Sequence, residues 1–159
     1  YQDGRAATKR LRRLMGGDYF DHPKDETVLR NIIAFASRED DLVLDFFAGS
    51  CATAHAVLAA NRADGGQRRF MMVQSPEETP LDSAARKAGF ATISQLGQER
   101  IRKVLAMFQA DLPERRSKRT QAEDLGLRVW RYAGGRRPRS LRGAARSDRA
   151  DAQPAVKEG

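Results

Sequence analysis

The stretch Val43–Val57 reads VLDFFAGSCATAHAV and decides the fold that we expect. A short apolar run ends in an acidic residue, Asp45, and a turn of small residues leads into an alanine-rich segment. Such an apolar run is typical of a parallel strand that is covered on both faces. We therefore expect a strand over residues 42–47, a tight turn, and a helix over residues 53–61.

Three other segments have the apolar spacing of helices. The first covers residues 5–14 and ends before Gly16 and Gly17. The second covers residues 26–38, with an expected buried stripe of Val28, Leu29, Ile32, Ile33, Phe35 and Ala36. The third covers residues 94–109, with a predicted apolar side of Leu96, Ile101, Val104, Leu105 and Phe108. Its predicted solvent-facing side carries Glu99, Arg100, Arg102 and Lys103.

Two more strands complete the expected sheet. Residues 69–74 form a second buried run, residues 83–88 a short helical turn, and residues 127–132 alternate as a strand does. This alternating order predicts an α/β fold with three mainly parallel strands and flanking helices. If the strands lie in the order third, second, first, residues 42–47 expose an apolar, unpaired edge. The sheet therefore resembles half of a doubly wound, Rossmann-like sheet.

Composition limits the class of protein. The 159 residues suit one domain, and the net charge of +8 favours anionic partners such as DNA. The single cysteine, Cys51, excludes an internal disulfide and is consistent with a cytoplasmic location. No apolar run is long enough to cross a membrane. Residues 133–159 hold arginines among Gly, Ala, Ser and Pro, and we expect a basic, disordered tail.

The turn after the first strand has the residue types of a ligand site, because open α/β sheets bind ligands beyond the carboxyl ends of their strands. Gly49 allows a close approach of the backbone, and Ser50 could cap the following helix. Asp45 could meet a cationic amino group, and Gln74 could bond two sugar hydroxyls. The phosphate-loop and dinucleotide fingerprints are both absent. On this pattern alone, a cofactor site and a structural turn are about equally supported.

Longer motifs carry a resemblance to a known family. VLDFFAGSCATAHAVLAANRADGGQRRFMMVQSPE resembles the S-adenosylmethionine-binding region of type III restriction-modification methyltransferases, which are β-class DNA adenine N6-methyltransferases. YFDHPK resembles the motif that precedes this region, and KAGFATISQLGQERIRKV and DLGLRVWRY resemble motifs that follow it. The resemblance runs from about Gly4 to Tyr132 and implies a C-terminal cofactor-binding half over residues 1–132.

The resemblance also implies roles for single residues. Asp45, Phe47, Gly49, Ser50 and Thr53 would surround the methionine part of S-adenosylmethionine. Pro23 and Lys24 would close over it, and Gln74 would reach the ribose. The remaining residues of the expected cofactor site are Phe20, Phe46, Ala48, Cys51 and Ala52. We expect no metal site. His55 is expected to pack or cap within its helix, and His22 to lie in a surface turn.

Three residues depart from the family pattern. Cys51 replaces a glycine, Ala52 replaces a threonine, and Asp25 replaces the second proline of a P-K-P stretch. If residue 51 has a positive φ, a cysteine there costs on the order of 1 kcal/mol. Losing the threonine hydroxyl removes a hydrogen bond worth roughly 0.5–1.5 kcal/mol. Both changes predict weaker cofactor binding.

The family's catalytic D-P-P-Y-type loop, which contacts the flipped-out adenine, has no counterpart in these residues. We therefore expect no catalytic residue here and no methyl transfer by this chain alone. The expected partners are DNA, the N-terminal catalytic half and a restriction subunit. Two alternatives stay open, namely a basic DNA-binding or docking module and a non-functional relic of such an enzyme.

Overall fold

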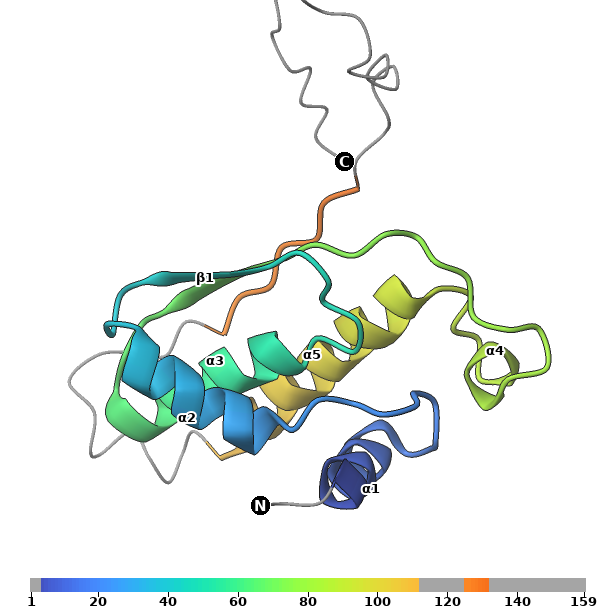
Figure 1. Ribbon diagram of the computed structural model, residues 1–159, viewed down its shortest axis with the longest axis horizontal. Coiled ribbons are helices and arrows are strands. Elements are labelled where there is room, and N and C mark those ends of the chain that lie inside the picture. Colours follow the sequence, from blue (N-terminus) through green and yellow to red (C-terminus); the bar gives the residue numbers. More distant parts are fainter. Residues whose placement is uncertain (1–3, 112–124, 132–159) are drawn as a thin grey trace, which may run out of the picture. The chain divides into compact units, whose positions relative to one another are not determined.

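The computed structural model describes residues 4–111 and 125–131 (Figure 1). Its elements are α1 (Gly4–Met15), α2 (Glu26–Ala36), β1 (Leu42–Asp45), α3 (Ala52–Asp64), β2 (Arg69–Met72), α4 (Ala84–Lys87) and α5 (Ile93–Ala110). The chain divides into two units, Tyr1–Leu127 and Arg128–Gly159. Every named element belongs to the first unit, and the described part of the second, residues 128–131, contains no helix or strand. No helix among the described residues has the length and apolar character to cross a membrane.

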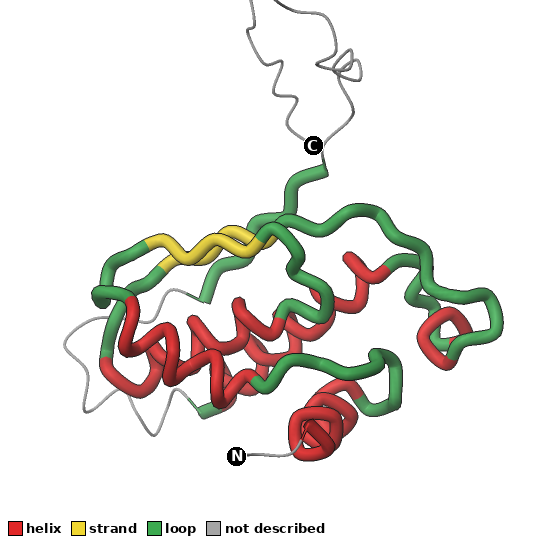
Figure 2. The backbone as a smooth tube through the Cα atoms, in the orientation of Figure 1, coloured by secondary structure: helices red, strands yellow, loops and turns green. Residues whose placement is uncertain are grey.

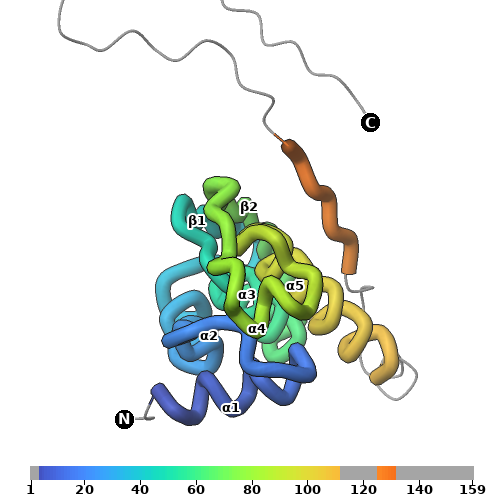
Figure 3. The backbone as a smooth tube through the Cα atoms, turned by 90° about the vertical axis from the view of Figure 1, so that its right-hand side faces the viewer, coloured from blue at the N-terminus to red at the C-terminus, as the bar shows by residue number. Residues whose placement is uncertain are grey.

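The two strands form a parallel pair that α3 connects, as the alternating pattern predicts. Leu42 pairs with Arg69 and Asp45 pairs with Met72 in a continuous register. The ladder extends beyond both ends, since Arg69 N donates to Asp41 O and Val73 N donates to Asp45 O. Figure 2 shows the strands lying over the helices, and Figure 3 shows β1 and β2 side by side above α3.

The core lies between the inner sheet face and the helices α2, α3 and α5. The first cluster of buried side chains joins α3 to α5 through Ala54, Leu58, Ile101, Val104, Leu105 and Phe108. A second joins α2 to α3 through Ile33, Ala56, Val57 and Ala60, with Val43 and Phe70 of the sheet packed against it. Alanines fill much of α3 because their small side chains let neighbouring elements approach closely. The apolar side predicted for α5 is confirmed, since all five of its residues are buried.

The expected buried stripe of α2 is only partly correct. Ile33 is buried and Leu29 is half-buried against α3, whereas Val28, Ile32, Phe35 and Ala36 are exposed. Phe35 is 94% exposed. The apolar pattern spans a wider arc of the helix than α3 covers. The second apolar side of α2 therefore has no covering element in the part of the chain that the structure describes.

The sheet is also covered on one face only, contrary to the expectation from the apolar runs. Both strands alternate between exposed and half-buried residues. The exposed apolar residues of the strands and of the positions just after them are Leu42, Leu44, Phe46, Met71 and Val73, which we call the outer sheet face. Leu44 and Met71 are register partners and so lie on the same side. An uncovered apolar face of this kind marks an interaction surface or an association hazard.

The third strand expected over residues 127–132 is wrong for the residues that the structure describes. Leu125 and Leu127 pack against the core that joins α3 and α5, without pairing as a strand. Val129 and Trp130 are neighbours in sequence, and both are exposed. Alternation yields a strand only where an edge offers hydrogen bonds and a face offers burial. Tyr132 and the expected basic tail, residues 133–159, lie outside the described residues.

Candidate cofactor site

The turn from β1 to α3 is held by the carboxylate of Asp45. Its Oδ1 accepts a hydrogen bond from the Phe47 amide at 3.0 Å, and its Oδ2 accepts one from Thr53 Oγ1 at 2.6 Å. An ionised carboxylate has about four acceptor positions. Asp45 is therefore fixed in orientation by the turn and still has capacity to accept from a ligand.

Gln74 connects the ends of the two strands. Its Oε1 accepts from the Gly49 amide at 2.7 Å, and the neighbouring Ala48 amide donates to Val73 O at 3.1 Å. Gly49 has a positive φ of 51°, which glycine adopts at no steric cost. The end of β2 thus supports the turn that follows β1. With one lone pair of Oε1 engaged, Gln74 keeps its two amide donors and a second lone pair for a sugar hydroxyl.

The segment between α1 and α2 supplies the other part of the candidate site. Phe20 is half-buried, and its ring lies 3.4 Å from where a Cβ on Gly49 would be. Pro23 is buried and Lys24 is exposed. A small cavity is lined by Tyr19 and Phe20, by Ser50 of the turn, and by residues of α1 and α5. The sequence-predicted residues Phe20 and Gly49, 29 positions apart, are therefore in contact distance.

Phe46 and Phe47 differ from the rest of the turn in their exposure. Phe46 is exposed on the outer sheet face, and Phe47 is 91% exposed just beyond it. Neither is a core residue among the described elements. An exposed phenylalanine beside the carboxyl end of a strand can contact a flat ligand or a covering segment.

Cys51 has the positive φ on which the expected cost of replacing glycine depends: its φ is 56° and its ψ is 39°, a left-handed conformation. Its thiol is buried against α5, where a Cβ added to Gly97 would lie 2.6 Å from Sγ. Burial is the main cause that raises the pKa of Cys51, to about 11, while the Arg100 charge opposes the shift. Ala52 begins α3 and is buried. The cysteine side chain therefore packs into the core of the fold.

The N-terminus of α3 has no side-chain cap, because Cys51 is its N-cap and makes no such bond. In α2, α4 and α5, side chains of Asp25, Ser83 and Thr92 bond to first-turn amides. The expectation that Ser50 caps α3 is wrong. Uncapped first-turn amides at the end of a parallel strand are suited to donate hydrogen bonds to an anionic group.

Ser50 instead accepts a hydrogen bond from Arg100. Arg100 Nη1 lies 3.0 Å from Ser50 Oγ, and Nη2 lies 3.4 Å from Glu26 Oε2 and 3.3 Å from His55 Nδ1. Arg100 is 1% exposed, so its predicted place on the solvent side of α5 is wrong. Residue 100 is four positions from both Leu96 and Val104, which are buried. That spacing is the sequence signal that could have placed it inside.

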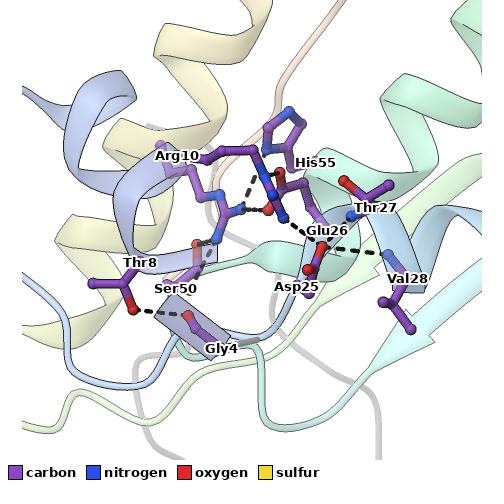
Figure 4. A network of polar contacts seen from close by, with 10 residues as sticks. Gly4, Thr8, Arg10, Asp25, Glu26, Thr27, Val28, Ser50 and His55 are labelled. Carbon is purple, nitrogen blue, oxygen red and sulfur yellow. Dashed lines mark hydrogen bonds and ion pairs between the residues drawn. The ribbon is translucent and has the colours of Figure 1, made fainter. Parts of the chain in front are cut away.

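The contacts of Arg100 extend into a wider polar network (Figure 4). Arg10 of α1 donates to Glu26 and to Asp25. Burial raises the pKa of Asp25, but the bonds from Arg10 and the Thr27 amide outweigh it, so the net pKa is lowered. Burial lowers the pKa of His55 to about 4, and the Arg100 charge adds to this shift while Glu26 opposes it. His55 is therefore a neutral side chain, and its ring contacts Arg100 of α5 in place of the predicted partner within its own helix.

No group of three or more His, Cys, Asp and Glu residues among the described residues is arranged to hold a metal ion. The polar groups that the structure brings together are instead one carboxylate, one side-chain amide, hydroxyls and backbone amides. These groups surround the turn from Asp45 to Thr53 and the segment from Phe20 to Lys24. Such a set suits a polar organic ligand that carries amino, carboxylate and hydroxyl groups.

The fold and the site define a class, an α/β domain with a polar turn at the carboxyl ends of its parallel strands, where open α/β sheets commonly bind ligands. Within that class, residues 3–93 match the family model described as DNA methylase. The chain therefore belongs to the DNA methylase family. This match covers α1 to α4, including the whole turn and the segment that contacts it.

Three relatives agree with the family match. The chain is 42% identical over 125 residues to the type III restriction-modification enzyme StyLTI Mod subunit of Salmonella typhimurium, which covers 79% of this chain and 18% of that protein. It is 36% identical over 98 residues to the EcoPI Mod subunit of Escherichia phage P1, with 62% and 15% covered. It is 37% identical over 102 residues to the type II methyltransferase M.KpnI of Klebsiella pneumoniae, with 64% and 24% covered. The matched region thus spans less than a quarter of each relative.

Proposed function

We propose that residues 1–132 are the S-adenosylmethionine-binding part of a site-specific DNA adenine N6-methyltransferase of restriction-modification type. The observation that carries this proposal is the turn of Asp45, Gly49 and Thr53, which Gln74 and Phe20 support from two other segments. It lies where open α/β sheets bind ligands, within the region that matches the DNA methylase family.

Each residue of the proposed site has a separate role in binding the cofactor. Bound S-adenosylmethionine supplies an activated methyl group. The carboxylate of Asp45 would accept from the cofactor's amino group, and the uncapped amides of the first turn of α3 would donate to its anionic end. Lys24 would pair with the cofactor's carboxylate, and the Gln74 amide would donate to a ribose hydroxyl. Phe20, Pro23 and Phe47 shield the cofactor from water. Phe46, Ala48, Ser50, Cys51 and Ala52 shape the turn around it.

Isothermal titration of the chain with S-adenosylmethionine tests this proposal directly. Asp45→Asn keeps the shape of the side chain and removes its charge, so affinity should fall by about tenfold, as expected for a charged hydrogen bond. Asp41→Asn is the matched control, because Asp41 is an exposed aspartate at the other end of β1. A folded chain that binds no cofactor, or equal affinities in the two variants, would contradict the proposal.

A second segment completes the enzyme in this proposal. The outer sheet face and the exposed side of α2 need a covering partner of apolar character. The catalytic half, with its D-P-P-Y-type loop and target-recognition region, is the proposed occupant, and DNA is the substrate. A restriction subunit is a further proposed partner of the assembled enzyme, since the Salmonella and phage P1 relatives are named as Mod subunits of restriction-modification enzymes.

A further inference from the structure

Arg100 is the largest fully buried side chain among the described residues. It lies on α5, far along the chain from both parts of the candidate site, and reaches back to each of them. One guanidinium nitrogen, Nη1, donates to Ser50 in the turn at 3.0 Å. The other, Nη2, donates to Glu26 in the first turn of α2 at 3.4 Å. Arg100 is therefore a direct bridge between the turn and the start of α2.

Glu26 strengthens this bridge because its two oxygens serve two arginines. Oε1 accepts from Arg10 of α1, and Oε2 accepts from Arg100. Arg10 also bonds to Asp25, which caps α2. The segment from Tyr19 to Asp25 is thereby held at its Asp25 end, to α1 through Arg10 and, by way of the adjoining Glu26, to α5 through Arg100. Figure 4 shows Arg10, Asp25, Glu26, Ser50 and His55 converging on one place.

Stability alone is a poor reason for this arrangement. Taking a guanidinium out of water is costly, and an apolar side chain of similar volume often stabilises a core as well or better. Arg100 even leaves Nε without a hydrogen-bond partner among the described residues. Buried ion pairs can instead specify one relative placement of the parts that they join. Here the joined parts are the two halves of the proposed cofactor site.

We infer that Arg100 is a positioning residue: through Ser50 and Glu26 it sets the separation between the Asp45–Thr53 turn and the Phe20–Lys24 segment. That the two segments form a cofactor site rests on the proposed function. That Arg100 joins them rests on its hydrogen bonds alone. It requires that the turn open when the bridge is removed, even without a cofactor. The residue itself needs no contact with the cofactor.

Cys51 offers a probe of that opening that needs no cofactor. It is the only cysteine of the chain, it is buried, and it is adjacent to Ser50. Labelling of its thiol by a small disulfide reagent under native conditions therefore reports how often the turn opens. Rates must be compared at equal free energy of unfolding, which added urea can adjust, so that global unfolding contributes equally.

Arg68→Met is the matched control for Arg100→Met. Arg68 is also buried, at 5% exposure, and its guanidinium bonds to Ser37 and Asp64 at the opposite end of the strands. Loss of the bridge should raise the Cys51 labelling rate by about tenfold in Arg100→Met, as loss of a charged hydrogen bond would. The Arg68→Met rate should stay within about twofold of wild type at matched stability. Ser50→Ala, which removes one hydroxyl, should behave like Arg100→Met and serves if that variant fails to fold.

Titration with S-adenosylmethionine supplies the second readout. Affinity should fall in Arg100→Met, recover partly in Arg100→Lys, and stay unchanged in Arg68→Met. Equal labelling rates in Arg100→Met and Arg68→Met would overturn the positioning role. If wild-type protein binds no cofactor, the proposed function fails, whereas the labelling rates still decide whether Arg100 holds the turn.

Discussion

Cys51 and Gly97 form a matched pair at the scale of single residues. Cys51 sits in a left-handed conformation that costs a non-glycine residue on the order of 1 kcal/mol. Its thiol occupies the space that the missing side chain of Gly97 leaves on α5. The same gap admits the Gly49 carbonyl, 2.9 Å from where a Cβ on residue 97 would be. The glycine of α5 therefore lets the turn lie directly on the helix.

Gly97→Ala should lower the free energy of unfolding by about 1–3 kcal/mol, the usual cost of overpacking a core. Part of this loss should be recovered in the double variant with Cys51→Gly, because the contact with Sγ disappears while the contact with the Gly49 carbonyl persists. Urea denaturation measures both values. Gly4→Ala is the control, since no atom lies within 4 Å of its added Cβ. Strictly additive effects of the two substitutions would contradict this packing.

His55 makes stability depend on pH. Its pKa is lowered from 6.5 in the unfolded chain to about 4, first by burial and then by the charge of Arg100, with Arg10 adding and Glu26 opposing. Between these values the unfolded state binds the extra proton. The free energy of unfolding should therefore decrease as pH falls from 6.5 towards 4, by an amount on the order of 3 kcal/mol.

Urea denaturation at a series of pH values checks this dependence. His55→Asn should flatten the slope within that window. His22→Asn is the control, because His22 is exposed and asparagine tolerates its positive φ of 49°. The lowered pKa of Asp25 contributes stability that is lost only at lower pH, below its unfolded value of 3.8. If His55→Asn leaves the pH dependence of the free energy of unfolding unchanged, other groups cause the loss of stability between pH 6.5 and 4.

At the scale of elements, the apolar patterns of the helices and strands predicted burial and strand pairing with different success. The stripe on α5 is confirmed because its apolar side is covered along its length, by α1 at Leu96 and by α3 from Ile101 to Phe108. The pattern on α2 predicts burial that only Ile33 and Leu29 achieve, since apolar spacing carries no information about which element covers it. The alternation in residues 127–132 predicted a strand, yet its described part lacks a paired edge.

The outer sheet face should make the isolated chain associate with itself. Leu44→Lys places a charge at its centre and should reduce association, while the free energy of unfolding stays within about 0.5 kcal/mol, as for other exposed sites. Sedimentation at several concentrations measures the first effect and urea the second. Leu81→Lys is the control, because Leu81 is 80% exposed and lies outside both strands, in the loop before α4. Equal association in the two variants would show that this face is not the contact.

At the scale of the whole molecule, binding and catalysis are assigned to different segments. The described residues offer a carboxylate, an amide and backbone donors for a cofactor. The contact to adenine belongs, in the proposed function, to a D-P-P-Y-type loop on the segment that covers the outer sheet face.

The chain alone should therefore transfer no methyl group to DNA when incubated with labelled S-adenosylmethionine. Addition of the remaining part of a Mod subunit should restore incorporation at adenine. Leu44→Lys should weaken this restoration, and Leu81→Lys should leave it intact. Incorporation by the isolated chain would contradict the assignment of catalysis to another segment.

The sequence by itself determined the α/β order, the helix predicted over residues 94–109 and the turn around Asp45, because local spacing and turn chemistry depend on neighbours along the chain. Its motifs also carried the family resemblance. Only the tertiary structure decided that Arg100 is buried on Ser50 and Glu26, that Cys51 packs on Gly97, and that one sheet face is uncovered. Those outcomes depend on residues that are distant in sequence, and no local pattern specifies which distant groups meet.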